Sequence, residues 1–292
     1  MIYENGAAFR QALEQHLRNI YLEKSIPISR LRKTIAFERL LARLIQSNPG
    51  IWVLKGGLNM ELRLGQYART TKDIDLLALE KPVQIYGMLV NSCQADLGDF
   101  FDFYAEKPPY ETFEDSTGTR YNIESRLDGR RFEQFHIDIG VKDILIEPPD
   151  LIKMSSHLDF AQIDSVVVPC YSIYQQIAEK FHAMTRTYSS GETSRVKDLI
   201  DILTLASNSD LELEKLKNAI TLTFLHRNTH PLPNIINGID NAYQRSFSKL
   251  SSQVFLRFQR IEDANEALNN LLSPVIFKRK SLVWNPNKFI WE

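Results

Sequence analysis

Residues 55–79 read KGGLNMELRLGQYARTTKDIDLLAL, and this stretch decides what fold to expect. A double glycine, Gly56-Gly57, follows one short apolar run, and an Asp-Ile-Asp triplet opens the next. Side chains alternate between the two faces of a strand, so Asp73 and Asp75 share a face while the isoleucine between them faces the core. The stretch therefore predicts a strand, a glycine turn, a helix and a second strand that presents two carboxylates on one side.

The composition of the whole chain is that of an ordinary folded protein. Of its 292 residues, 43% are hydrophobic and 24% are charged, so it can bury a sizeable core. The formal net charge of −1 gives no reason to expect a non-specific nucleic-acid binder, although a local basic groove is compatible with it.

The cysteines and the apolar runs indicate where the protein works. Cys93 and Cys170 are isolated and form neither a disulfide framework nor a zinc spacing, which favours a reducing cytoplasm. The start of the chain is charged throughout and has no apolar region typical of a signal peptide. No run approaches the roughly 18 apolar residues of a membrane-spanning helix. We therefore expect a cytoplasmic protein without a membrane partner.

Hydrophobic periodicity predicts an α+β fold. Helical spacing of apolar residues predicts helices over residues 6–24, 28–47, 58–64 and 82–97. Strands are expected over residues 51–55, 73–79, 119–127, 130–140 and 165–172, with Asp128-Gly129 as a hairpin turn. The pattern is helical from Ile173 onward, and the Ser/Gly-rich stretch 187–194 is expected to be a loop. A mixed sheet with flanking helices (1–172) and an all-α C-terminal bundle (173–292) are thus predicted.

The two aspartates of the triplet need a positive charge between them. Their backbones are expected about 6–7 Å apart, and like charges at that distance repel each other. A divalent cation such as Mg²⁺ or Mn²⁺ accepts carboxylate oxygens together with the oxygens of a substrate phosphate. In FHIDIG, residues 135–140, the two isoleucines face the core, so Asp138 faces the other side. Asp73, Asp75 and Asp138 therefore predict a two-metal site, in which one ion activates an attacking oxygen and the other stabilises the leaving phosphate.

Each of these motifs also has a purely structural interpretation. A D-x-D triplet at the start of a strand is often merely solvated, and a Gly-Gly pair is often only a turn. Between a strand and a helix, however, bare backbone N–H groups and the helix N-terminus can hold a phosphate. The order of the motifs, with glycines after a strand, D-x-D on the next strand and a third Asp on a paired strand, favours a nucleotide site.

This arrangement resembles the DNA polymerase β-like nucleotidyltransferases, whose signature is Gly-Gly or Gly-Ser, then D-x-D, then a later Asp. More narrowly, five blocks over roughly residues 50–207 resemble the AbiEii-type nucleotidyltransferase toxins of bacterial toxin–antitoxin and abortive-infection systems. The blocks are LKGGLNMEL, ARTTKDIDLL, HIDIG, IAEKFHAM and SRVKDLIDI. The gap of fifteen residues between Gly57 and Asp73 is longer than is usual in the broad superfamily, which weakens any transfer of detail from polymerases.

The resemblance implies that a Lys and an Asp on later helices complete the site. These are Lys180, a point charge for a triphosphate, and Asp198, which would bind or orient the acceptor or Lys180. Asp201 is the less certain of the two acids in SRVKDLIDI. The structural alternatives are an exposed helix lysine and an ion pair between Arg195 and Asp198, three residues apart on one helix.

Further residues beside the motifs are candidates for phosphate contacts, although each alone is more often a surface charge. The candidates are Lys55, Gly56, Gly57, Arg69, Lys72, Arg195 and Lys197. Thr71 is a candidate for another reason, because some relatives are silenced by phosphorylation of a Ser or Thr at this place. A phosphate there would add about two negative charges. The alternative is a hydroxyl that caps the strand.

We therefore expect a metal-dependent nucleotidyltransferase with Asp73, Asp75, Asp138, Lys180 and Asp198 as its catalytic residues. The resemblance implies a toxin that transfers a nucleoside monophosphate from a nucleoside triphosphate to RNA, with the 3′ end of tRNA as the favoured acceptor and a cognate antitoxin as the protein partner. Transfer to a small molecule or a protein stays open. So do a D-x-D glycosyltransferase and a binding module with a decayed site.

Overall fold

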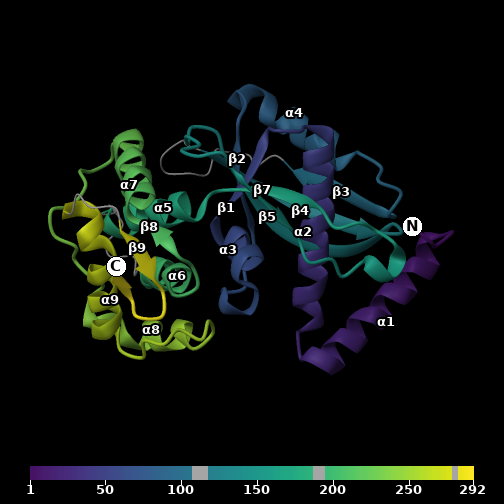
Figure 1. The fold of residues 1–292 in the computed structure, drawn as a ribbon. Coiled ribbons are helices and arrows are strands. Elements are labelled where there is room, and N and C mark those ends of the chain that lie inside the picture. Colours follow the sequence, from purple (N-terminus) through teal and green to yellow (C-terminus); the bar gives the residue numbers. More distant parts are fainter. Residues whose placement is uncertain (107–117, 187–194, 278–281) are drawn as a thin grey trace. The chain divides into compact units, whose positions relative to one another are not determined.

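The structure is a computed structural model that describes residues 1–106, 118–186, 195–277 and 282–292. These residues fold into two compact units (Figure 1). The first comprises residues 1–62, 70–142 and 149–170, and the second comprises residues 63–69, 143–148 and 171–292. The domains 1–172 and 173–292 stay a prediction, since the second unit also takes up two short segments from earlier in the chain. The loop predicted at 187–194 lies outside the described residues.

A mixed sheet is the centre of the first unit. In the described part of the chain it has seven strands in the order β3-β4-β5-β2-β1-β7-β6. The strands are β1 (Trp52–Lys55), β2 (Ile74–Ala78), β3 (Phe101–Glu106), β4 (Gly118–Leu127), β5 (Arg130–Gly140), β6 (Asp150–Lys153) and β7 (Val167–Cys170). Strand β2 pairs antiparallel with β1 and parallel with β5. The strand that carries the D-x-D motif therefore lies inside the sheet, next to the strand that carries the third aspartate.

The α-helices described before the C-terminal part of the chain are α1 (Gly6–Lys24), α2 (Ile28–Ser47), α3 (Gly56–Leu64) and α4 (Pro82–Cys93). The bounds predicted for α1 and α2 are confirmed. Asn5 caps α1 by accepting a hydrogen bond from the Ala8 N–H at 2.9 Å. Helix α4 ends at Cys93, earlier than the predicted residue 97, because the chain closes in a turn in which the Ala95 N–H donates to the Ser92 carbonyl at 3.1 Å, three residues back.

The second unit is mainly helical. Its α-helices are α5 (Ile173–Thr185), α6 (Val196–Ser207), α7 (Leu213–Arg227), α8 (Gln244–Ser251) and α9 (Ile261–Phe277). Short 3₁₀ helices occur in both units at η1 (Gly65–Tyr67), η2 (Asp159–Ala161) and η3 (Asn241–Tyr243). No helix in the described ranges combines the length and the apolar character that crossing a bilayer requires.

A small sheet departs from the all-helical second part that the sequence predicts. It consists of β8 (Leu211–Glu212), β9 (Val283–Asn285) and β10 (Ile290–Trp291), in the order β10-β9-β8. Trp284 is fully buried and donates its ring N–H to the Ala206 carbonyl at 2.8 Å. It pairs with Leu211, far away in sequence, and local periodicity cannot reveal such a pairing. The predicted α+β class is confirmed.

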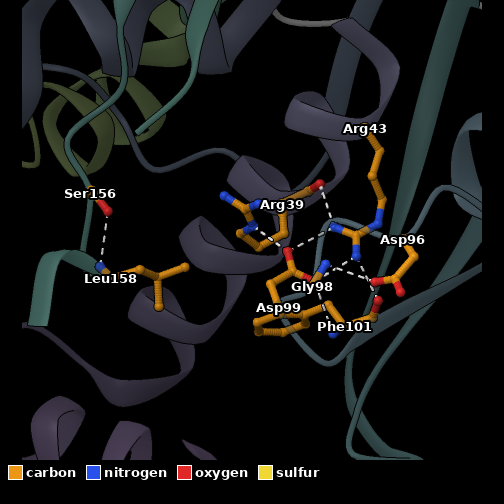
Figure 2. A network of polar contacts seen from close by, with 8 residues as sticks. All are labelled: Arg39, Arg43, Asp96, Gly98, Asp99, Phe101, Ser156 and Leu158. Atoms are coloured by element: carbon orange, nitrogen blue, oxygen red, sulfur yellow. Dashed lines mark hydrogen bonds and ion pairs between the residues drawn. The ribbon is translucent and has the colours of Figure 1, made fainter. Parts of the chain in front are cut away.

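A closed network of charges lies inside the first unit (Figure 2). Arg39 on α2 donates to Asp99 at 2.7 Å, and Arg43, one turn later, donates to both oxygens of the same carboxylate at 3.0 and 2.6 Å. Arg43 also donates to the Phe101 carbonyl at 2.6 Å. Burial opposes the ionised form of Asp99, but the two guanidinium groups outweigh it and hold its pKa below the usual value. The network ties α2 to the start of β3.

Candidate active site

The glycine turn after β1 touches the acidic strand. Gly56 has a φ of +66°, which an L side chain rarely adopts, and α3 begins at this residue. A Cβ at Gly56 would overlap the Asp75 carboxylate, and a Cβ at Gly57 would lie 2.8 Å from the Thr71 hydroxyl oxygen. Both positions therefore require the absence of a side chain. The backbone of Gly56 and Gly57, which the sequence predicts to bind a phosphate, thus packs directly against the segment that carries the D-x-D motif.

The three predicted metal ligands lie on neighbouring strands of the first unit. Asp75 on β2 and Asp138 on β5 are direct partners in the parallel pairing, and Asp73 comes one residue before β2 begins. Ile74 and Ile137, which precede the two paired aspartates, are fully buried. The aspartates are only half-buried. The alternation that the sequence predicts thus leaves the carboxylates on the side opposite the core.

A guanidinium group supplies positive charge to these carboxylates. Arg120 on β4 lies opposite Asp138 and donates to both of its oxygens, at 2.7 and 2.6 Å. The pKa of Arg120 is raised, first by the hydrogen bonds to Asp138 and then by the charges of Asp138, Asp73 and Asp75. The sequence predicts a cation among these acids, but it does not identify Arg120, which lies outside every motif.

The donor atoms in the first unit fit a divalent hard cation. Mg²⁺ prefers oxygen ligands, and Asp73, Asp75 and Asp138 offer only carboxylate oxygens. Within the described ranges, no three acidic, His or Cys side chains already lie close enough together to hold an ion. Asp138 is bonded to Arg120 instead. An ion taken up here would compete with this guanidinium for the Asp138 oxygens.

A second group of charges lies in the second unit, and we call Arg69, Lys180, Asp198 and Asp201 the helical cluster. Asp201 on α6 accepts a hydrogen bond from the Lys180 ammonium of α5 at 2.6 Å. It also accepts two from the Arg69 guanidinium, at 2.9 and 2.8 Å. Asp198 lies 4.0 Å from the Lys180 nitrogen and 3.4 Å from an Arg195 guanidinium nitrogen. Asp201 thus bonds to two cations, whereas Asp198 makes only longer contacts with its cations.

Burial and charge act differently on the members of the helical cluster. Burial alone would raise the pKa of Asp201, but Lys180 and Arg69 outweigh it and hold that pKa below its usual value. Burial also opposes the charge on Lys180, yet the two carboxylates raise its pKa above the usual value. For Asp198 burial prevails over Lys180 and Arg195, and its pKa is raised. The cluster therefore keeps Lys180 protonated and makes Asp198 the acid that more readily takes up a proton.

In the helical cluster, Asp201 makes closer contacts with the cations than Asp198, the acid that the sequence favoured. The resemblance favoured Asp198, whereas Asp201 makes the short hydrogen bonds to both cations. The signal for Asp201 was present, since it follows Asp198 by three residues on one helix. The Arg69 guanidinium is bonded to Asp201, and its contact with a phosphate stays a prediction.

The remaining candidates occupy varied surroundings. Lys55 lies opposite Asp75 in the β1–β2 pairing. The Thr71 hydroxyl donates to the Asp73 carbonyl at 3.1 Å, as expected for a hydroxyl that caps the strand. Lys72 and Lys197 are exposed. Of the predicted site residues, the structure brings together in the first unit Lys55, Gly56, Gly57, Thr71, Asp73, Asp75 and Asp138. In the second unit it joins Arg69, Lys180, Arg195 and Asp198.

Comparison with known proteins places the chain among nucleotidyltransferases. The family model described as "Nucleotidyl transferase AbiEii toxin, Type IV TA system" matches residues 39–281. The chain is also similar in structure to MenT4, a nucleotidyltransferase toxin from Mycobacterium tuberculosis H37Rv. The identity is 15%, the match covers 93% of this chain and 99% of that chain, and the TM-score is 0.56.

A second solved structure with some likeness is JHP933 from Helicobacter pylori. Its identity is 16%, the match covers 82% of this chain and 97% of that chain, and the TM-score is 0.41. No curated protein sequence matches the chain. The likeness to MenT4 shows a shared fold, and the family match extends over most of the two units.

Proposed function

The chain belongs to the AbiEii nucleotidyltransferase toxin family, and from this premise we propose that it transfers a nucleoside monophosphate from a nucleoside triphosphate to RNA. It is a nucleotidyltransferase, and its family is one of toxin–antitoxin systems, which implies an antitoxin partner. The RNA acceptor, the metal dependence and the roles of individual residues are proposals.

One observation carries the proposal, namely the contact between the glycine turn and the acidic strand. Gly56 lies so close to the Asp75 carboxylate that no side chain fits between them. Asp138 is the direct strand partner of Asp75. A phosphate bound by the backbone N–H groups at the start of α3 would therefore lie beside carboxylates that can share a cation with it.

The chain's own residues have separate tasks in the proposed reaction. Gly56 and Gly57 bind phosphate oxygens through their backbone, and Lys180 provides a protonated ammonium as a countercharge for the triphosphate. Asp138 accepts the proton of the acceptor hydroxyl. The hydroxyl oxygen forms a bond to the α-phosphorus, the bond from that phosphorus to the bridging oxygen breaks, and pyrophosphate leaves. Mg²⁺ or Mn²⁺, held by Asp73, Asp75 and Asp138, would neutralise the negative charge that develops on the phosphate.

We propose the 3′ end of tRNA in the cytoplasm as the acceptor. Nucleotides added there would prevent aminoacylation and stop translation, which fits the toxin family to which the chain belongs. A small molecule or a protein is the second candidate acceptor. The net charge of −1 favours it, because an RNA-binding protein usually carries excess positive charge.

Label transfer tests the proposal. Purified protein is incubated with total tRNA, Mg²⁺ and each of the four α-labelled nucleoside triphosphates in turn, beside the variant Asp73→Ala. We expect label on tRNA from one or two triphosphates, absent in the variant and abolished when EDTA removes the metal. A folded wild-type protein that labels no RNA, but labels a small molecule or a protein in a cell extract, would overturn the RNA acceptor.

A further inference from the structure

A cavity lies wholly among the described residues of the second unit, and neither the helical cluster nor the acidic strand contributes to its lining. Its volume is about 190 Å³, and it is bounded by the C-terminal end of α6, by η1, by the turn at 254–257 and by residues 286–287. Its wall contains two aromatic rings, two polar side chains and one guanidinium group. These are Tyr67, Phe255, Ser207, Asn208 and Arg257.

The aromatic rings at this cavity are unusually open to solvent. Phe255 is 71% exposed and Tyr67 is 42% exposed. Their ring centroids lie 6.3 Å apart with an angle of 77° between the planes, so they meet edge to face. An edge-to-face pair leaves ring faces uncovered, and uncovered aromatic faces are the surfaces on which proteins stack nucleobases.

The backbone at Phe255 is held in a conformation that its side chain disfavours. Its φ is +52°, in the left-handed region that a bulky residue rarely adopts. The N–H groups of Val254 and Leu256 both donate to the Ser251 carbonyl, at 3.2 and 3.3 Å, and fix the turn. The phenyl ring gains little burial in return. Strain of this kind, without a gain in packing, is typical of a residue kept for binding.

Polar groups complete the wall of the cavity. The Ser207 hydroxyl oxygen is buried and has no hydrogen-bond partner among the residues that the structure describes. The Asn208 side chain donates to the Thr204 carbonyl at 2.8 Å, and its own carbonyl oxygen is an acceptor. Arg257 is anchored by hydrogen bonds to the Pro286 and Asn287 carbonyls, both at 3.0 Å. The cavity therefore offers stacking surfaces, hydrogen-bonding groups and a fixed positive charge.

The cavity and the helical cluster are built on the same two segments. Asp201 and Thr204 lie three residues apart on one face of α6, and Asn208, the C-cap of this helix, bonds back to the Thr204 carbonyl. The helical rise from Asp201 to the end of α6 at Ser207 is about 9 Å along the axis. Tyr67 lies two residues before Arg69, which bonds to Asp201. A ligand in the cavity would thus lie near charges that we assign to the reaction.

We propose that this cavity binds an unstacked nucleobase, which stacks on an uncovered ring face of the Tyr67–Phe255 pair while Ser207 and Asn208 contact its polar edge. The base comes either from the nucleoside triphosphate or from a single-stranded end of the RNA acceptor. The inference rests on the proposed function, because both sources are substrates of that reaction. It assigns to the second unit a recognition task that neither the motifs nor the family match contains.

Binding by the full chain tests the inference separately from catalysis. The variants are Tyr67→Ala and Phe255→Ala, and the control is Tyr21→Ala, which removes an aromatic residue of 48% exposure from α1. One arm measures the affinity for each of the four nucleoside triphosphates by calorimetry. The other measures fluorescence anisotropy with a short labelled single-stranded RNA and with the same RNA lacking its bases.

Each arm identifies one source of the base. We expect Tyr67→Ala and Phe255→Ala to weaken binding about 10-fold in one arm, as is usual for the loss of a stacking ring. Weaker binding of RNA alone, without any effect on the RNA that lacks bases, assigns the cavity to the acceptor. Weaker binding of triphosphate alone assigns it to the nucleotide. Unchanged affinity in both arms, or wild-type protein that binds neither probe, overturns the inference.

Label transfer by the wild-type protein keeps this inference apart from the proposed function. If RNA binds through the cavity but no label is transferred, the inference stands and the proposed reaction fails. If label is transferred and no variant changes either affinity, the reaction stands and the inference fails.

The variant Phe255→Gly separates a binding role from a structural one. Glycine adopts a positive φ without strain, and the exposed ring contributes little packing. We expect weaker binding together with an unchanged or higher melting temperature. A residue with a purely structural role would show the opposite, with lower stability and unchanged affinity.

Discussion

Two clusters of buried charge, one in each unit, have the same arrangement of one carboxylate between two cations, but they differ in their exposure to solvent. In the first unit Asp99 lies between Arg39 and Arg43 (Figure 2), and the three side chains are 1%, 5% and 0% exposed. In the second unit Asp201 lies between Lys180 and Arg69, which are 13% and 21% exposed. In both, a single carboxylate carries two cations that oppose its protonation.

The difference between these clusters separates a structural network from a candidate site. The side chains of the closed network are at most 5% exposed, and they bond to one another and to backbone atoms of Arg39 and Phe101. The helical cluster is partly open and contains a second acid, Asp198, whose pKa burial raises. An open cluster with a spare acid and a protonated lysine can exchange its partners with a ligand, whereas a closed one loses stability if any member leaves.

The largest effect should follow removal of the acid from the closed network. Asp99→Ala leaves Arg39 and Arg43 buried without their carboxylate, and we expect a loss of about 3–5 kcal/mol in the free energy of unfolding. Urea unfolding of the full chain measures it. Asp102→Ala, at an exposed position of β3, is the control and should change the unfolding free energy by less than about 0.5 kcal/mol. Equal effects of the two variants would contradict a structural role for Asp99.

A substitution in the helical cluster should lower the activity of the protein more than its stability. Lys180→Ala removes the proposed countercharge of the triphosphate, and we expect label transfer to fall by about 10²- to 10³-fold. Stability should change less than in Asp99→Ala, since Asp201 keeps both hydrogen bonds to Arg69. Lys215→Ala, which removes an exposed lysine paired with Glu212, is the control. Strong destabilisation with normal transfer by the folded protein would make the helical cluster structural.

A third test concerns a buried acid beside the closed network whose carboxylate makes no hydrogen bond to Arg39 or Arg43. Glu38 is fully buried next to Arg39, and burial raises its pKa from 4.5 to about 7, with Arg39 offsetting only part. The unfolded chain loses this proton near pH 4.5 and the folded chain near pH 7. The contribution of Glu38 to the free energy of unfolding should therefore be largest below pH 4.5 and fall by no more than about 3 kcal/mol as the pH rises to about 7.

The variant Glu38→Gln removes the group that produces this slope. We expect unfolding free energies that are less dependent on pH between 4.5 and 7, and higher stability than the wild type at pH 8. Urea unfolding across this range measures both, with Glu23→Gln at an exposed position of α1 as the control. A slope that persists in Glu38→Gln would show that another group titrates.

The smallest effect concerns Arg120, whose pairing with Asp138 is more open to solvent than either cluster. Its side chain is 43% exposed, yet it makes two short hydrogen bonds to a proposed metal ligand. Arg120→Ala removes a competing positive charge, and we expect Mn²⁺ to bind about 10-fold more tightly in the absence of nucleotide. Electron paramagnetic resonance of free Mn²⁺ measures this. Arg126→Ala, which breaks a pair with Glu124 on the same strand, is the control. Weaker binding in Arg120→Ala would mean that the guanidinium helps to assemble the ligands.

Much of the fold follows from local patterns in the sequence. Helices α1 and α2 have the predicted bounds because their apolar residues recur at helical spacing and Pro27 separates them. The Asp128-Gly129 turn joins β4 and β5 as predicted, with both residues at positive φ. The small sheet was not predictable, because its strands have only two or three residues and pair across long stretches of chain.

The order of Gly56, Asp75 and Asp138 along the chain was enough to indicate the acidic site and the family. The side chains that pair with those acids could not be predicted from the sequence, as Arg120 illustrates. A regular two-residue hairpin would place it opposite Ile137, but a bulge between Ser125 and Arg126 shifts the register by one residue. That shift turns Arg120 to the face of Asp138. Local propensity sets which residues form a strand, whereas register and the pairing of distant charges are settled only when the whole sheet and the packed helices exist.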